Sequence, residues 1–597
     1  MSMTIERPAP TASRPSPLRR LVNRRLDHYP ETPARLANLA IVVAVTVLLY
    51  WQLYVDGGAA TRILRDLDMS FLYFTGLTAA GAAIGAFASL AAGLADRWGR
   101  ANLVAYGVAV AALITLVGFP LCDTKLEFAG CFAALSLVEG IVLVGTAGLV
   151  RDFSPQVGRG SAMGFWTLGP VLGSLMVTVV ASRTLDRYDT WQSQFVICGI
   201  AGVVVAVAAI LFLRELAPDL RDQVMVELDD RELLERRAAR GAGIAHTGGL
   251  RAFAAVAKVR VLGPALGVSL ALILYYTLVA FAVVLLATTF GYSESRANGL
   301  VSWYWATSTV VLIATGLLSD KLRVRKPFLL VGGLGFALCT IVFLGKLTEP
   351  GTSYGTLRAL LIGMAAFQSV LYVPWMAAYT ETLEDLSPSL VAAGLAVWGW
   401  VVRIVVCGVF LALPHVVSGV TTLVEAPPAA ALQAQGAKLK AEQVKLETQG
   451  AKLKVRAATL TEQGAALKAQ AAQAAAAGVT PTPAQMAAGK AAQARLQTAG
   501  AQLQREASAL RTQGAALKAR GTAFKASVAH LQATAKAVPT RWQTWLWICV
   551  AGQILFVPLA LLLRGRWSPK TATADLRRHD AEVDAELGRV EALNAAA

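Results

Sequence analysis

Long apolar runs recur through the whole sequence and leave very few folds open to it. They lie near residues 38–57, 70–93, 101–121, 127–149, 162–183, 191–213, 263–290, 298–318, 327–347, 357–379, 389–413 and 542–563. About 20 residues of α-helix cross the roughly 30 Å hydrocarbon core of a bilayer. Backbone polar groups in lipid must bond within their own segment, which favours helices over open strands. The runs therefore predict an all-α, multi-pass membrane protein with twelve transmembrane helices.

The bulk composition excludes an ordinary soluble protein. Hydrophobic residues make up 55% of the chain and charged residues 16%, whereas soluble domains carry about 25% charged residues. The six cysteines lie within or beside apolar runs, and no C-x-x-C or Cys/His cluster occurs. A disulfide framework and a metal site are therefore not expected. The first apolar run is as long as a full span, so we interpret it as a helix and not as a cleaved signal peptide.

Basic residues fix the predicted orientation of these helices. They gather in the segments on one side: residues 1–37, 97–100, 151–159, 214–262, 321–326 and 564–570. Cytoplasmic loops of membrane proteins carry an excess of Lys and Arg. This side is therefore predicted to face the cytoplasm, with both termini inside the cell and the protein in the inner, or plasma, membrane. The acidic loop 380–386 is an exception to the pattern.

The sequence also repeats itself weakly, about six helices apart. Residues 152–155 read DFSP and 385–388 read DLSP, while 93–100 read GLADRWGR and 316–326 read GLLSDKLRVRK. Such repeats are typical of transporters in which two similar halves enclose a substrate site near mid-membrane. The predicted parts are a basic N-terminal segment (1–37), a six-helix bundle (38–213), a central cytoplasmic loop (214–262), a second six-helix bundle (263–415 with 541–564), an insert (426–540) and a cytoplasmic tail (565–597).

The GLADRWGR loop resembles the signature loop between helices two and three of the major facilitator superfamily. The resemblance covers about 38–414 and 541–564 and implies two pseudo-symmetric six-helix bundles that rock around a central site. Charged residues at the cytoplasmic end would form a latch, paired in one conformation and separated in the other; ordinary loop charge is the alternative. The candidate latch residues are Gly93, Asp96, Arg97, Gly99 and Arg100, and in the second half Asp320, Lys321 and Arg325.

Helix five carries a second pattern, GFWTLGPVLGS, at residues 164–174. Its Gly164, Gly169, Pro170 and Gly173 resemble the antiporter motif of the same family. In that family the motif is associated with export by antiport, whereas the alternative is close helix packing by small residues. The arginine motif of helix four is not matched, because Ser136 stands near its place. Details of proton coupling therefore do not transfer from the family.

Two ionisable residues lie near mid-span, where a charge is costly and is a functional candidate. Glu139 of helix four is the candidate proton site. Arg403 of helix eleven suits a carboxylate or phosphate group on a substrate; the alternative is that the two residues pair with each other. Aromatic candidates for the substrate site are Trp166, Tyr275, Tyr276, Trp398 and Trp400, although Trp and Tyr also anchor helices at membrane interfaces.

No catalytic or nucleotide-binding pattern appears in the sequence. Neither a G-x-x-x-x-G-K-[ST] loop nor a Ser/His/Asp arrangement is visible, so we expect neither an enzyme nor a bound cofactor nor direct drive by ATP. An ion gradient, most simply of protons, is the expected source of energy.

The insert at 426–540 has a different composition, rich in Ala, Gln, Lys and Gly. Leucine recurs every seven residues from 432 to 467 and again, with Phe524, from 496 to 531. With the turn GVTPTP at 478–483, this predicts an extracytoplasmic, coiled-coil-like antiparallel helical hairpin; disorder is the alternative. Fifteen Lys and Arg against four Glu give it a net charge of +11. This charge favours an anionic envelope polymer, lipid headgroups or an acidic protein partner over nucleic acid, or else only a solvated surface.

These patterns predict a secondary active transporter of the major facilitator type that moves a small organic solute. The proton is the expected coupling ion. The alternative function is an envelope interaction protein that uses a transporter-like anchor to display the basic hairpin. The sequence leaves open the substrate, the direction of transport and the oligomeric state.

Overall fold

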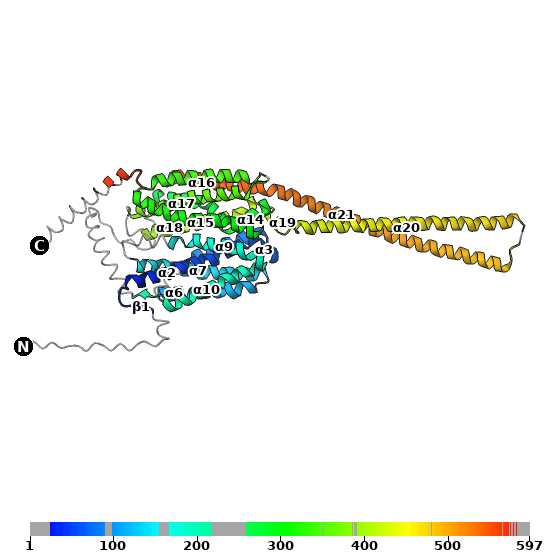
Figure 1. Ribbon diagram of the computed structural model, residues 1–597, viewed down its shortest axis with the longest axis horizontal. Helices are drawn as coiled ribbons and strands as arrows, with labels where there is room; N and C mark the ends of the chain where they lie inside the picture. Colours follow the sequence, from blue (N-terminus) through cyan, green and yellow to red (C-terminus); the bar gives the residue numbers. More distant parts are fainter. Residues whose placement is uncertain are drawn as a thin grey trace, which may run out of the picture. The chain divides into compact units, whose positions relative to one another are not determined.

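The computed structural model describes residues 24–89, 98–154, 166–217, 258–349, 351–384, 386, 391–478, 480–563, 565–571, 573, 574, 577, 581 and 585. The chain forms two compact units, Met1–Val424 with Ala537–Ala597, and Glu425–Lys536. Most described residues are helical (Figure 1), as the sequence predicts. The first unit is a bundle of long helices, and the second consists of two long helical arms.

The first half of the bundle contains six long helices. They are α2 (Thr32–Gly58), α4 (Phe71–Ala88), α6 (Arg100–Leu113), α7 (Lys125–Phe153), α9 (Gly169–Tyr188) and α10 (Gln192–Phe212). A short helix, α3 (Ala60–Asp66), follows α2, and a π-helical turn (Ile114–Gly118) with a 3₁₀ turn (Phe119–Leu121) extends α6. The short parallel strands β1 (Arg25–Leu26) and β2 (Glu215–Leu216) join the two ends of this half, with Arg25 opposite Glu215.

The second half of the bundle begins with one span in two pieces. These pieces are α13 (Val259–Ala271) and α14 (Ile273–Phe290), which are interrupted at Leu272. The other helices are α15 (Glu294–Leu322), α16 (Lys326–Lys346), α17 (Tyr354–Glu384), α18 (Val391–Val416), the short α19 (Val420–Val424) and the last part of α21 (Pro483–Ala560).

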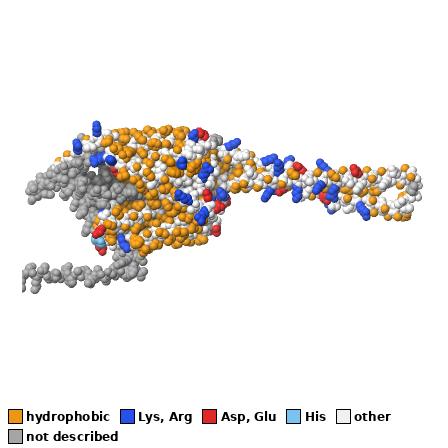
Figure 2. All heavy atoms as spheres, in the orientation of Figure 1, with side chains coloured by type: hydrophobic (Ala, Val, Ile, Leu, Met, Phe, Trp, Pro, Cys, Tyr) orange, Lys and Arg blue, Asp and Glu red, His pale blue; other side chains and the backbone are white. Residues whose placement is uncertain are grey.

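Within the part of the chain that the structure describes, eleven segments are long and apolar enough to cross a membrane. They include every predicted span except helix five, which corresponds to α9. The last turns of α9 carry Arg183, Asp186 and Arg187, which lower its mean hydropathy, so the twelfth span stays a prediction. Apolar side chains cover much of the visible bundle surface (Figure 2). The side chain of Phe87, for example, is 65% exposed. A surface of this kind is typical of a protein embedded in lipid.

Successive helices of the bundle alternate in direction, so that its loops gather at two ends. We call them the Arg62 end, where α2 ends and α15 begins, and the Arg100 end, where α6 begins and α15 ends. At the Arg62 end, side-chain oxygens of Ser70, Thr124 and Ser293 accept backbone hydrogen bonds in the first turns of α4, α7 and α15. Such caps satisfy backbone N–H groups that have no partner within the helix. The sequence therefore marks where these helices begin.

The two halves approach each other closely where α2 crosses α14. A Cβ atom placed on Gly57 of α2 would lie only 2.7 Å from the carbonyl oxygen of Val279. The two helices therefore cross almost backbone to backbone. The halves also pack together through α9 against α15 and through α4 against α18.

Small residues let α9 pack tightly against α2 within the first half. A Cβ atom on Gly173 would lie 2.7 Å from Cβ of Tyr50 and 2.9 Å from the backbone nitrogen of Trp51. Gly169 lies one turn earlier, against Thr46, and Pro170 stands in the first turn of α9. This contact is close helix packing by small residues, which is the alternative interpretation of the helix-five pattern. Gly164, the first glycine of that pattern, lies outside the described residues.

We expect Gly173→Ala to destabilise the bundle, because the added methyl group forces α2 and α9 apart. Overpacking of this kind costs about 1–3 kcal/mol, and thermal unfolding of the purified protein in detergent measures it as a lower midpoint. The matched control is Gly408→Ala in α18, where nothing lies within 4 Å of the added atom. An equal midpoint in the two variants would contradict the close packing at Gly173.

The second unit, Glu425–Lys536, contains α20 (Ala429–Ala476) and the first part of α21. Its two arms run in opposite directions (Figure 1), as the heptad pattern and the turn predict. Phe524 lies 3.4 Å from a Cβ atom placed on Gly436, and Leu510 lies 3.5 Å from one placed on Gly450, so glycines of one arm face large side chains of the other. No residue of α20 is buried, and the seam is therefore thin. The anionic partner of this unit stays a prediction.

Two ion pairs link the arms across the seam. Arg456 Nη1 lies 2.9 Å from Glu506 Oε2, and Arg520 Nη1 lies 2.9 Å from Glu442 Oε2. The acid and the arginine stand 14 residues apart on each arm, which is also the spacing of the glycines at 436, 450 and 464. A slip of 14 residues would preserve the glycine pattern but would bring like charges together. We infer that these pairs select the register of the hairpin.

We expect Arg520→Glu to loosen the hairpin, and the double variant Glu442→Arg with Arg520→Glu to restore it. Exposed ion pairs contribute about 0.2–1 kcal/mol each, so the effect is partial. It is measured as the cross-linking yield of cysteines placed at Gln449 and Gln513, midway between the two pairs, and read by mass spectrometry. Lys518→Glu changes the charge equally and serves as the control; a yield that follows charge alone would contradict register selection.

Candidate functional site

Arg403 of α18 is half-buried in the interior of the bundle. Its guanidinium donates a long hydrogen bond of 3.4 Å to the carbonyl oxygen of Gly399 in its own helix. Tyr50 of α2 and Tyr276 of α14, which belong to different halves, lie within electrostatic range of Arg403. Among the described residues Arg403 forms no ion pair with an acidic side chain. Its positive charge is therefore available to a ligand.

Tyr50 and Tyr276 each have further aromatic neighbours. Tyr50 and Tyr54 of α2 have ring centroids 5.6 Å apart. Tyr275 lies 5.1 Å from Tyr276 and 5.3 Å from Trp305, again between ring centroids. Tyrosine offers an apolar ring face together with a polar hydroxyl group. These tyrosines can thus contact both the apolar body and the polar groups of one ligand.

A second polar cluster lies within the first half and carries acidic groups. Glu139 of α7 is 2% exposed, and neither of its carboxylate oxygens has a hydrogen-bond partner among the described residues. Asp56 of α2 is also buried and interacts electrostatically with Glu139. The side chains of Gln52 and Ser136 are buried beside them in the same two helices, and their polar atoms likewise lack partners within the described chain. Glu139 and Arg403 therefore do not pair in this structure.

The other predicted aromatic residues have different surroundings. Trp166 donates a hydrogen bond of 3.1 Å to the hydroxyl of Thr146. Trp400 packs against Phe87 of α4, with ring centroids 5.7 Å apart. Trp398 packs 5.5 Å from Trp375 of α17, and its indole nitrogen has no partner among the described residues. The structure thus places Tyr276 within electrostatic range of Arg403 and Tyr275 beside Tyr276, and it places Trp166 and Trp400 in contacts between helices.

The Arg100 end holds the described part of the predicted latch. Gly99 has a φ of +87° and precedes α6, and the buried carboxylate of Glu215 accepts a hydrogen bond of 3.2 Å from the backbone nitrogen of Ala101. Arg100 Nη1 lies 2.9 Å from Asp152 of α7. These contacts lie within the first half; Gly93, Asp96 and Arg97 lie outside the described residues.

The corresponding charges of the second half also pair among themselves. Arg325 lies 2.8 Å from Asp320 and 3.0 Å from Glu381 of α17. Lys321 stands in the last turn of α15. These pairs belong to the second half alone, so they do not show a latch between the halves, and that role stays a prediction.

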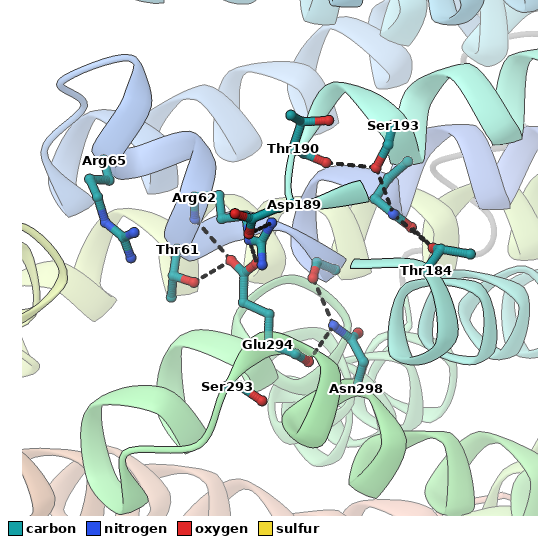
Figure 3. Close-up of polar contacts among 12 residues, drawn as sticks. Thr61, Arg62, Arg65, Thr184, Asp189, Thr190, Ser193, Ser293, Glu294 and Asn298 are labelled. Carbon is teal, nitrogen blue, oxygen red and sulfur yellow. Dashed lines mark hydrogen bonds and ion pairs between the residues drawn. The ribbon is translucent and has the colours of Figure 1, made fainter. Parts of the chain in front are cut away.

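The Arg62 end joins the two halves through polar groups that the sequence interpretation missed (Figure 3). Arg62 of α3 forms ion pairs with Glu294 of α15, at 2.6 Å, and with Asp189 at the end of α9, at 2.9 Å. Asn298 of α15 donates a hydrogen bond of 2.7 Å to the carbonyl oxygen of Gly58. Glu294 and Asp189 fall at the edges of apolar runs in the sequence, where they resemble ordinary loop charges.

Comparisons with known proteins agree with the fold of the bundle. Residues 42–401 match the family described as Major Facilitator Superfamily. A solved bacterial homologue of the human lysosomal transporter Spinster, inward-facing and unoccupied, is similar in fold, with a TM-score of 0.56 and 16% identity over 90% of this chain and 100% of that one. The occupied form of the homologue gives a TM-score of 0.55, 15% identity and the same coverage.

A curated relative is similar over a shorter stretch of the chain. It is the "Efflux pump radE" of Floropilus chiversii, 24% identical over 190 residues, which are 30% of this chain and 34% of the relative. The match thus spans about a third of that relative's length. The family match covers well over half of the chain, and the fold agrees with it. The chain therefore belongs to the Major Facilitator Superfamily and is a membrane transporter rather than an enzyme.

Proposed function

We propose that this protein is a proton-coupled secondary active transporter that exports a small organic anion by alternating access. The observation that carries the proposal is the half-buried charge of Arg403, which pairs with no acidic side chain among the described residues and lies within electrostatic range of a tyrosine from each half. A charge inside the bundle without an acidic partner is costly. An anionic substrate would supply the missing partner.

The chemistry around Arg403 defines the substrate class. A guanidinium group binds a carboxylate or phosphate through two parallel hydrogen bonds. The rings of Tyr50, Tyr275 and Tyr276 offer apolar faces for the rest of the molecule. The favoured substrate is a small organic acid with an apolar or aromatic body. Because the tyrosines come from both halves, such a substrate can stay in contact with each half as the halves rock.

The acidic cluster supports coupling to protons. Glu139 and Asp56 are buried close enough to interact, and no Lys or Arg pairs with Glu139 among the described residues. An unpaired carboxylate is unfavourable in an apolar interior, and binding of a proton removes its charge. Uptake and release of a proton at this cluster would therefore change the electrostatics of the first half during the cycle.

The orientation and direction rest on the charge pattern and on similarity. The excess of Lys and Arg at the Arg100 end favours a cytoplasmic location for this end and for both termini, in the cell membrane. The Arg62 end would then face outward. The likeness of the helix-five pattern to an antiporter motif favours export in exchange for entering protons. The similarity to an efflux pump supports the same direction.

Arg403→Ala is expected to reduce transport of the organic anion at least about tenfold, because a hydrogen-bonded charge contributes about 1.5–3 kcal/mol. Arg403→Lys keeps the charge and should retain part of the activity. The measurement is flux of a panel of labelled organic acids in proteoliposomes with an imposed proton gradient. Arg358→Ala is the control, since Arg358 lies over the ring of Trp303 at 5.4 Å. Unchanged flux in Arg403→Ala would contradict the role of Arg403 in binding the anionic group of the substrate.

Glu139→Gln should abolish accumulation driven by the proton gradient while exchange of substrate across the membrane continues. Glutamine has a similar shape but cannot bind and release the proton, so binding survives and coupling is lost. Asp56→Asn tests the second carboxyl group in the same assay. Glu349→Gln is the control, because Glu349 pairs with Lys346 at 2.6 Å on the exposed surface. Gradient-driven accumulation at the normal level in Glu139→Gln would refute this coupling role.

A further inference from the structure

The polar contacts at the Arg62 end form one cluster that crosses between the halves of the bundle. We call it the Arg62 cluster and define it by Thr61, Arg62, Asp189, Glu294 and Asn298 (Figure 3). We propose that this cluster is a latch that holds the Arg62 end closed, and that Asp189 eases its release by keeping Arg62 paired when Glu294 departs. This inference rests on the proposed alternating access.

Each half contributes a different chemical part of the cluster. The first half supplies donors, namely the hydroxyl of Thr61 and both the backbone nitrogen and the guanidinium of Arg62. The second half supplies Glu294, whose carboxylate accepts from Thr61 and from the backbone nitrogen of Arg62, the latter at 2.9 Å. The guanidinium adds the ion pair of 2.6 Å. Glu294 is thus held by three groups of the opposite half.

Burial makes the contact with Glu294 stronger than an ordinary surface ion pair. The side chain of Glu294 is 5% exposed and that of Arg62 is 18% exposed, whereas that of Asp189 is 88% exposed. Charge–charge attraction grows as water is excluded, while exposed pairs contribute little. Arg62 therefore has one strong partner across the interface and one weak partner within its own half.

Neighbouring contacts show that this end is closed. Ser295 of α15 donates a hydrogen bond of 2.6 Å to the carbonyl oxygen of Ser182 in α9. The cavity bordered by Tyr54, Val177, Asn298 and Trp305 has a volume of only about 10 Å³, near the lower limit for a single water molecule. A solute cannot pass here unless α15 separates from α3 and α9.

The position of Asp189 determines what happens to the charges on separation. Asp189 caps the end of α9 with a left-handed φ of 49°, so it stays with Arg62 in the first half when the second half moves away. Glu294 then enters water with its charge, and Arg62 keeps an acidic partner. Asp189 thus stabilises the open arrangement relative to the closed one, whereas Glu294 stabilises only the closed arrangement.

The two carboxyl groups therefore have opposite predicted effects. Glu294→Gln should shift the protein towards opening at the Arg62 end, and Asp189→Asn should shift it towards closure. A change of about fivefold or more in each direction is expected, typical of coupling across a conformational equilibrium. Arg187→Gln is the matched control, since Arg187 lies in the last turn of α9 at the same end but contacts the ring of Tyr188 in its own half, at 5.7 Å.

The experiment follows accessibility of the cavity in the full-length protein in lipid nanodiscs. Val177→Cys supplies the reporter, because Val177 lines the cavity and is buried. Its rate of alkylation by a water-soluble maleimide is read by peptide mass spectrometry, which separates it from the native cysteines. We expect faster alkylation with Glu294→Gln, slower alkylation with Asp189→Asn and no change with Arg187→Gln.

Two outcomes would overturn the latch. One is an unchanged rate with Glu294→Gln, and the other is an increased rate with Asp189→Asn. Thermal unfolding of each variant identifies loss of fold, and the milder Glu294→Asp, which keeps the charge but shortens its reach, should then give a smaller increase in rate. The labelling needs neither substrate nor gradient. Failure of the latch is therefore distinct from failure of the transport assay.

Discussion

A charge inside hydrocarbon costs a great deal of free energy unless it is paired or hydrated, and the arrangement of this bundle depends on that constraint. The lipid-facing surface is apolar, and the interior charges lie at the helix ends or between helices. Arg100 pairs with Asp152 at one end, and Arg62 pairs with Glu294 at the other. Among the described residues, the buried polar groups without partners include Glu139, Gln52 and Ser136 inside the first half, where binding of a proton or a polar solute would satisfy them.

The two halves carry complementary chemistry. Acidic groups, Glu139 and Asp56, lie in the first half, whereas the unpaired cation, Arg403, lies in the second. Tyr50 lies within electrostatic range of both Glu139 and Arg403. In the proposed function, proton binding at Glu139 and substrate binding at Arg403 would therefore take place at separate positions in the bundle.

The sequence predicts the helices, the two halves and the hairpin because these follow from local periodicity and from repeats. It also makes Arg403 and Glu139 candidates, since a charge near mid-span stands out in an apolar run, and their roles stay predictions. It does not identify Asp56 or Glu294, which fall at the edges of such runs. Arg62 and Glu294 are 232 residues apart, and their contact depends on how α3 meets α15. Hydropathy alone also does not establish α9, whose last turns are charged.

The crossing at Gly57 has a mechanical consequence. Where α2 meets Val279 of α14, no side chain of Gly57 interlocks with the neighbouring helix. Two helices whose backbones touch at a glycine can rotate against each other with few changes of side-chain rotamer at that point. The crossing lies close to Gly58, which accepts a hydrogen bond from Asn298. In the proposed cycle, the helix crossing at Gly57 and the contacts of the Arg62 cluster would therefore change together.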